Sequence, residues 1–165
     1  MELIDQLQSQ VFSEQNNHIS LIKEKDIPEV CVLISDCFNH NGFDGSLSIA
    51  DTAISLKNII CEDEHLAIKY SENGKVLGAG IFMLVPNLFN RKSYKVTEIM
   101  WDSSPHISRI KRGRVMISIL NFMIKYYHGI GDISRISIPL KNKSVMSYLI
   151  KKGFRGKEVS FIKEL

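Results

Sequence analysis

The segment from Tyr94 to Arg114 constrains the fold more than any other part of this 165-residue sequence. An alternating, strand-like stretch (residues 94–101) leads to a basic turn (residues 109–114), and an apolar-periodic stretch that predicts a helix begins at Val115. A strand, a basic turn and a helix N-terminus combine free backbone N–H groups, the positive end of the helix dipole and cationic side chains. The segment therefore predicts an anion site, with phosphate as the expected ligand.

Gly113 is the only glycine in the basic turn. The P-loop and the dinucleotide fingerprint both need several glycines at fixed spacing, so neither motif is present. A solvated basic turn without a ligand is the alternative, and the strand–turn–helix context favours the anion site.

The composition is that of an ordinary globular protein, 44% hydrophobic and 24% charged, and the length predicts one domain. The apolar runs are too short to span a bilayer, and the first residues lack the features of a secretory signal. Cys31, Cys37 and Cys61 have no metal-like spacing, so neither a disulfide nor a metal site is expected, and a cytoplasmic location fits. The net charge of +3 does not by itself imply a nucleic-acid partner.

The order of predicted elements indicates an α/β or α+β domain. Residues 1–17 predict a short amphipathic helix or a mobile arm, and residues 18–165 predict a single domain. The predicted strands are residues 19–22, 65–70, 75–85, 94–102 and 135–138, with one or two closing strands in 154–165. The predicted helices are residues 26–38, 49–61, 115–127 and 142–152. We therefore expect a mixed, mainly antiparallel sheet of six to seven strands with flanking helices, in which residues 86–93 form a polar crossing.

Glycines mark three of the connections. Glu72-Asn73-Gly74 is a hairpin signal between two apolar runs. Gly78 and Gly80, in the returning strand, predict a bulge or a close approach of another backbone. Gly153 is typical of the residue that ends a helix, and it predicts the end of the last helix.

Three motifs make the chain resemble the GNAT-type N-acetyltransferases from residue 19 to its C-terminus. Residues 73–80 resemble the hairpin between that family's second and third strands. Residues 97–101, Pro105 and the basic turn resemble its fourth strand and its pyrophosphate loop for acetyl-coenzyme A. Residues 142–154 resemble its late N-x-x-A-x-x-x-Y-x-x-x-G-F helix, which is the most specific of the three matches. The arrangement is also similar to short acetyltransferase-like proteins that bacteriophages encode.

The sequence departs from the family pattern at two places. In the loop pattern Q/R-x-x-G-x-G/A, Arg112 and Arg114 stand where small residues are expected. In the late helix, Leu149 stands where the family carries its general-acid tyrosine, and Tyr148 comes one residue earlier, a rotation of about 100° on a helix. The alternative to an enzyme is therefore a non-catalytic protein that keeps the fold for binding or structure, for example a phage component.

The resemblance implies an N-acetyltransferase that uses acetyl-coenzyme A as co-substrate, with a cleft where the fourth and fifth strands splay apart. The pantetheine would pair with exposed backbone of the fourth strand, and the basic turn would hold the pyrophosphate. Each charge-assisted contact contributes about 1.5–3 kcal/mol when it is desolvated. Asn142 would contact the coenzyme, although capping of the helix also explains an asparagine there. The coenzyme residues that the resemblance implies are Met100, Trp101, Asp102, Arg109, Arg112, Gly113, Arg114 and Asn142.

Acetyl transfer to an amine needs a base for the ammonium group and an acid for the departing thiolate. Glu98 is the only acidic residue in the apolar part of the fourth strand, and alternation places it on one face with Val96 and Met100. The sequence leaves two roles equally open for Glu98, a catalytic base or a solvent-facing glutamate. It also leaves two roles open for Tyr148, the catalytic acid or a packing residue of the helix.

The expected partner is a small-molecule or protein amine that the sequence does not identify. A nucleic-acid binder built on the basic turn is not favoured, because no aromatic platform is interleaved with the cations. The oligomeric state does not follow from the sequence.

Overall fold

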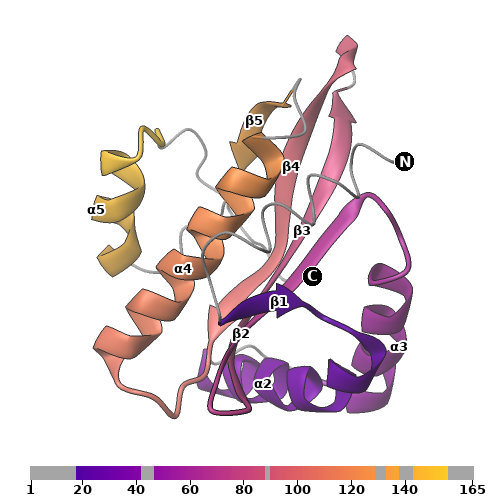
Figure 1. Ribbon diagram of the computed structural model, residues 1–165, viewed down its shortest axis with the longest axis vertical. Helices are drawn as coiled ribbons and strands as arrows, with labels where there is room; N and C mark the ends of the chain where they lie inside the picture. Colours follow the sequence, from indigo (N-terminus) through magenta and orange to yellow (C-terminus); the bar gives the residue numbers. More distant parts are fainter. Residues whose placement is uncertain (1–17, 42–46, 88–89, 129–132, 138–142, 156–165) are drawn as a thin grey trace, which may run out of the picture.

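The computed structural model describes residues 18–41, 47–87, 90–128, 133–137 and 143–155 (Figure 1). Its strands form one sheet in the order β1-β2-β3-β4-β5, in which β1 to β4 are antiparallel neighbours and β5 runs parallel to β4. The strands are β1 (Ile19–Leu21), β2 (His65–Glu72), β3 (Lys75–Asn87), β4 (Asn90–Ser103) and β5 (Ile133–Ser137).

The helices follow the predicted order along the chain. They are the short 3-10 helix η1 (Glu24–Asp26) and the α-helices α2 (Ile27–His40), α3 (Ile49–Ile59), α4 (Arg109–His128) and α5 (Lys143–Lys151). Pro28 lies in the first turn of α2, as predicted. The mixed, mainly antiparallel architecture is thus confirmed.

Two predictions about the sheet are wrong. The described residues form five strands rather than six or seven, and the predicted closing strands fall mainly on residues 156–165, outside the described part of the chain. The predicted polar crossing at residues 86–93 is largely strand, because β3 continues to Asn87 and β4 begins at Asn90. The arm predicted at residues 1–17 also lies outside the described residues.

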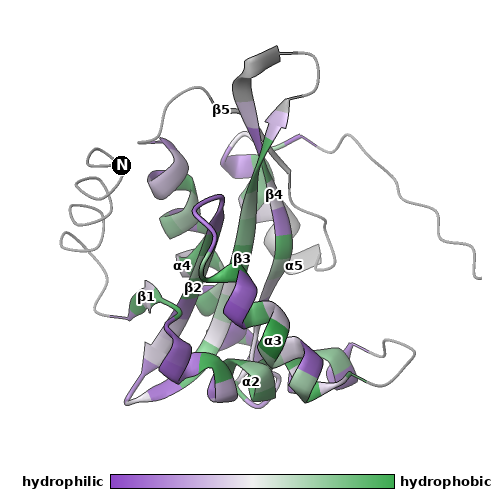
Figure 2. Ribbon diagram, turned by 90° about the vertical axis from the view of Figure 1, so that its right-hand side faces the viewer, coloured by the Kyte–Doolittle hydropathy of each residue, from purple (hydrophilic) through white to green (hydrophobic). Residues whose placement is uncertain are grey.

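The helices form a layer on each face of the sheet. Figure 2 shows α2 and α3 on the near side of the sheet, with α4 and α5 beyond it. One apolar core joins α4 and Leu149 of α5 to the sheet, and a second core joins α2 and α3 to its other face. The buried residues of α4 are Val115, Met116, Ile119, Leu120, Phe122, Met123, Tyr126 and Tyr127.

The two glycines of β3 let α4 lie close against the sheet. A Cβ atom on Gly78 would lie 2.4 Å from Cγ1 of Val115, and one on Gly80 would lie 2.7 Å from Cγ2 of Ile119. Both distances are too short for a real contact, so the predicted close approach is confirmed. This approach fixes where α4 begins relative to the end of β4.

Local turn chemistry is also as the sequence indicates. Asn73 and Gly74 have φ values of 51° and 76°, as the hairpin turn between β2 and β3 requires. Gly153 has φ 85°, and the N–H groups of Gly153 and Phe154 donate to the carbonyl groups of Ile150 and Leu149. These two bonds are the Schellman pattern that ends α5.

Candidate functional site

β4 lies between β3 and β5 in the sheet. It pairs with β3 over most of its length, but its ladder with β5 covers only Tyr94–Thr97. Beyond Thr97, β4 continues to Ser103, and no further pairing with β5 occurs among the described residues. The residues that would pair with β4 beyond Thr97 follow Ser137 and lie outside the described part of the chain, so the predicted divergence stays a prediction. The chain leads from this end of β4 to α4 (Figure 1).

A β-bulge lies in β4 just beyond its described ladder with β5. Glu98 pairs with Phe82 and Met100 pairs with Ile81, so Ile99 has no partner in the ladder. A bulge adds one residue to one strand and bends it. Ile99 is accordingly 46% exposed.

The bulge changes which side chains share a face. Met100 packs against the core of α2 and α3, whereas Trp101 and Val96 belong to the core under α4. The predicted face of Val96, Glu98 and Met100 is therefore wrong for Met100, because the extra residue reverses the alternation. Glu98 is half-buried, and its partner Phe82 belongs to the core under α4, so Glu98 lies on the α4 side.

The Trp101 side chain is a core element of the α4 interface. It is 8% exposed, and its Nε1–H donates to the carbonyl oxygen of Met116 at 3.0 Å. Its side chain thus fixes β4 to α4, and its predicted coenzyme contact concerns the backbone of β4.

α4 begins at Arg109 and not at Val115, so the predicted start of this helix is wrong. Ser108 caps it: its Oγ accepts from the N–H of Lys111 at 3.3 Å, and its carbonyl accepts from the N–H of Arg112 at 2.9 Å. The predicted basic turn therefore forms the first turns of the helix. Gly113 lies inside it, so its N–H bonds within the helix and is not available to an anion.

Lys111 ties the first turn of α4 to the end of β2. Its Nζ lies 2.5 Å from Oε2 of Glu72, whose Oε1 accepts from the hydroxyl of Tyr70 at 2.8 Å. The hydrogen bonds from Lys111 and then Tyr70 lower the pKa of Glu72 from its ordinary value.

Arg112 ties the same turn to β4 and α2. Its Nη2 lies 3.5 Å from Oδ1 of Asp102, and its Nη1 lies 3.2 Å from Nε2 of His40. Asp102 also accepts from Nδ2 of Asn41 at 3.0 Å and from the N–H of Ser103 at 2.7 Å. We call Arg112, Asp102, His40 and Asn41 the α4 clamp.

A cysteine and a serine lie buried beside the α4 clamp. The thiol of Cys37 donates to the carbonyl oxygen of Ser103 at 3.5 Å. Burial, reinforced by the negative charge of Asp102, raises the pKa of Cys37 to about 12, so the thiol is protonated and unreactive at neutral pH. The hydroxyl of Ser103 is buried and has no hydrogen-bond partner within the described structure.

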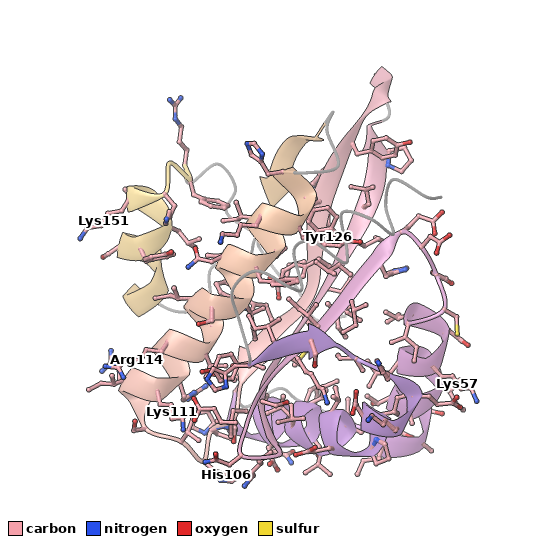
Figure 3. All side chains as sticks on the ribbon, viewed as in Figure 1. Lys57, His106, Lys111, Arg114, Tyr126 and Lys151 are labelled. Atoms are coloured by element: carbon pink, nitrogen blue, oxygen red, sulfur yellow. The ribbon has the colours of Figure 1, made fainter. Side chains whose placement is uncertain are left out.

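Arg109 and Arg114 are the exposed cations of the basic segment. Figure 3 shows Arg114 pointing away from the sheet near the start of α4, while Lys111 lies at the same end of the helix. A Cβ atom on Gly113 would meet none of the atoms of the described residues within 4 Å.

Tyr148 contacts α4. Its hydroxyl donates to Oδ1 of Asn121 at 2.6 Å, and Nζ of Lys152 lies 5.7 Å from the centre of its ring. Leu149 is 2% exposed and belongs to the core under α4, so a core residue occupies the position of the expected acid. Asn142 lies outside the described residues, and its role stays a prediction.

The partners of the basic segment were not predicted from the sequence. The sequence could have predicted the cap at Ser108, since a serine just before a run of helical residues is a typical N-cap. His40 and Asn41 carry no such signal, because they reach Arg112 and Asp102 only through the tertiary fold.

The described part of the chain contains no helix long and apolar enough to cross a membrane. Nor do its described residues contain a group of three or more side chains that would hold a metal ion.

No protein-family model and no curated protein matches the sequence. Solved structures do match it. Glucosamine-6-phosphate N-acetyltransferase from Arabidopsis thaliana is 13% identical, with a TM-score of 0.68 over 88% of this chain and 96% of that one. An aminoglycoside acetyltransferase from an uncultured soil metagenomic sample is 12% identical, with a TM-score of 0.62 over 89% of this chain and 95% of that one. A transcriptional regulator from Bacillus halodurans C-125 is 12% identical, with a TM-score of 0.69 over 89% and 98%.

At such identities the likeness establishes the fold alone. The predicted acetyltransferase-like fold is confirmed, and the chain has the α+β fold of these acetyltransferases.

Proposed function

We propose that this protein is an N-acetyltransferase that transfers an acetyl group from acetyl-coenzyme A to a primary amine. The observation that carries the proposal is the basic N-terminus of α4, capped by Ser108 and following β4, in an acetyltransferase-like fold. A helix N-terminus favours phosphate, and the predicted divergence of β4 from β5 would leave strand backbone whose N–H and C=O groups pair with an extended ligand.

The donor site uses the backbone of β4 and the start of α4. The pantetheine would pair with the backbone of Met100, Trp101 and Asp102. The pyrophosphate would lie at the first turn of α4, with the exposed side chains of Arg109 and Arg114 and the backbone at Gly113 nearby. Asn142 stays a proposed coenzyme residue from the sequence motif.

Glu98 is the proposed base. It is half-buried, lies on the α4 side of the sheet and adjoins the bulge in β4. The amine nitrogen would attack the thioester carbonyl carbon, a proton would pass from the amine to the Glu98 carboxylate, and the thiolate of coenzyme A would leave. Tyr148 is the proposed acid for that thiolate, and it would give up its hydrogen bond to Asn121 to act.

A binding role without catalysis is the second candidate. Leu149 is buried where the acid is expected, and the donors of Arg112 already bond to Asp102 and His40. One structural neighbour is described as a transcriptional regulator, so proteins with this fold are not all described as acetyltransferases.

The cellular setting is also a proposal. A cytoplasmic location fits a chain whose cysteines Cys31, Cys37 and Cys61 are all unpaired. A bacteriophage origin rests on the sequence motifs alone.

Titration calorimetry with acetyl-coenzyme A and with free coenzyme A tests the donor site first. Release of free thiol is then followed with polyamines, aminoglycosides and lysine- or N-terminus-bearing peptides. Glu98→Gln keeps the shape but cannot take the proton, so turnover should fall about 10²–10⁴-fold with coenzyme affinity little changed. Tyr148→Phe should lower turnover less, because the thiolate is a good leaving group.

Each outcome selects a candidate. Absence of coenzyme binding rejects the acetyltransferase proposal. Binding without acetylation of any amine favours the non-catalytic role. Full turnover in Glu98→Gln keeps the enzyme and rejects the base.

A further inference from the structure

The side chain of Arg112 reaches across the end of β4 to the opposite helix layer. Its guanidinium contacts Asp102, at 3.5 Å, and His40 at the C-terminus of α2, at 3.2 Å. A guanidinium only donates hydrogen bonds, so Nε2 of His40 accepts, which requires a neutral imidazole with its proton on Nδ1. Arg112 therefore joins α4 to α2 directly, at the mouth of the proposed donor site.

Asp102 is the centre of the α4 clamp. Its two carboxylate oxygens together accept from Asn41, from the N–H of Ser103 and from Arg112. The side chains of Arg112 and Asp102 are 23% and 19% exposed, so this pair is partly removed from water. A partly desolvated pair with further hydrogen bonds orders its surroundings more strongly than an exposed pair.

The first turn of α4 is also fastened on a second side. Lys111 binds Glu72 at the end of β2, and successive helix residues point about 100° apart. The two consecutive cations thus tie one turn of helix to two different parts of the fold. Both side chains therefore already have acidic partners within the protein.

We propose that Arg112 is a positioning residue and not a ligand of the coenzyme: with Asp102, it holds the first turns of α4 in place at the donor site. The functional half of this inference rests on the proposed function. A structural consequence follows without it, because loss of either partner frees the first turns of α4 from the end of β4.

The two roles of Arg112 predict opposite effects of Asp102→Asn. If Arg112 were a coenzyme ligand, removal of the Asp102 charge would release its guanidinium and strengthen coenzyme binding. If Arg112 positions α4, the same change loosens the helix start and weakens binding. The sign of one measured change therefore separates the roles.

The experiment is calorimetry of coenzyme A with Arg112→Gln, Asp102→Asn and the double variant. We expect each single change to lower affinity about three- to tenfold and the double variant to lose no more than the larger single loss, as for two partners of one contact. In turnover assays the KM for acetyl-coenzyme A should rise, while kcat and the KM for the amine stay close to those of the unmodified protein. Arg112→Lys, which keeps one charged donor, should restore part of the affinity.

Lys57→Gln is the matched control. It removes another lysine–carboxylate contact, with Glu24 at 2.6 Å, but that contact is exposed and lies on the α3 side of the sheet. It should leave coenzyme affinity unchanged.

Hydrogen exchange and urea unfolding without ligand test the α4 clamp independently of the proposed function. Amides of the first turns of α4 should exchange faster in both single variants, and the stability losses should be less than additive in the double variant. Stronger coenzyme binding by Asp102→Asn, or additive losses of stability, would overturn the proposal. If no variant and no unmodified protein binds coenzyme, the proposed function fails, and the exchange and unfolding data still decide the α4 clamp.

Discussion

Two glycines near the start of α4 have opposite surroundings. Gly78 lies in β3 beneath the helix, where a Cβ atom would meet Val115 at 2.4 Å and the carbonyl oxygen of Asp102 at 3.1 Å. Gly113 lies in the helix itself, where a Cβ atom would meet nothing within 4 Å. Packing therefore requires the first glycine, whereas nothing in the described structure requires the second. A glycine inside a helix costs about 1 kcal/mol relative to alanine, and no contact among the described residues requires that cost at Gly113.

The largest expected effect is that of Gly78→Val. The added side chain would collide with α4 and with the end of β4, so we expect the free energy of unfolding to fall by about 3 kcal/mol. Urea unfolding followed by circular dichroism measures this change.

Val115→Ala in the same background provides the control for the collision. It removes the atom that approaches Gly78 most closely, so the double variant should be more stable than the sum of the two single losses predicts. A strictly additive double variant would show that the glycine is needed for some reason other than the contact with α4.

The second prediction compares two neighbours across the bulge in β4. Trp101→Phe removes a buried hydrogen bond and part of a core side chain, so we expect a loss of about 2 kcal/mol. Ile99→Thr changes an exposed residue and should alter stability by less than about 0.5 kcal/mol. Equal losses would mean that the bulge does not divide the faces of β4 as described.

The same contrast explains what the sequence predicts well. Gly74, Gly78 and Gly153 each act through local geometry or through the missing Cβ atom, and their predicted roles are confirmed. The bulge at Ile99 was not predicted, because its sequence, Thr97-Glu-Ile-Met-Trp101, contains no glycine or proline and reads as regular alternation. Pairing with β3 creates the bulge, and pairing partners are not visible in a single sequence.

The candidate site shows the same limit. A basic segment near the end of a strand was predicted, and the structure places it at the N-terminus of α4. The sequence could not predict which of its cations contact acidic side chains of the protein and which are exposed. Lys111 contacts Glu72 in β2, and Arg112 contacts Asp102 in β4, whereas Arg114 is exposed.

Gly113→Ala is the third prediction, and its effect on stability has the opposite sign to that of Gly78→Val. The open space at this position accommodates a methyl group, and alanine is the better helix former, so stability should rise by up to about 1 kcal/mol. Under the proposed function, coenzyme affinity should fall in the same variant, because the methyl group would fill space that the ligand approaches. A more stable protein with unchanged coenzyme affinity would remove Gly113 from the donor site.

The smallest expected effect concerns the contact of Lys111, in the first turn of α4, with Glu72 at the end of β2. Hydrogen bonds from Lys111 and Tyr70 lower the pKa of Glu72 below its ordinary value of 4.5. A carboxyl group whose pKa is lower in the folded protein stabilises it above the unfolded pKa, and this contribution is lost as the pH falls through the folded pKa. Glu72→Gln should therefore lower the urea midpoint slightly at pH 7, and the difference should shrink as the pH falls below 4.5 and through the lowered pKa of Glu72, because the carboxylate of the unmodified protein takes up its proton there. Lys111→Gln removes the main cause of the shift and should reduce the same acid-dependent loss, as should high salt, because the contact is partly exposed. A constant difference between Glu72→Gln and the unmodified protein from pH 7 to pH 3 would show that Glu72 acts through packing and not through its charge.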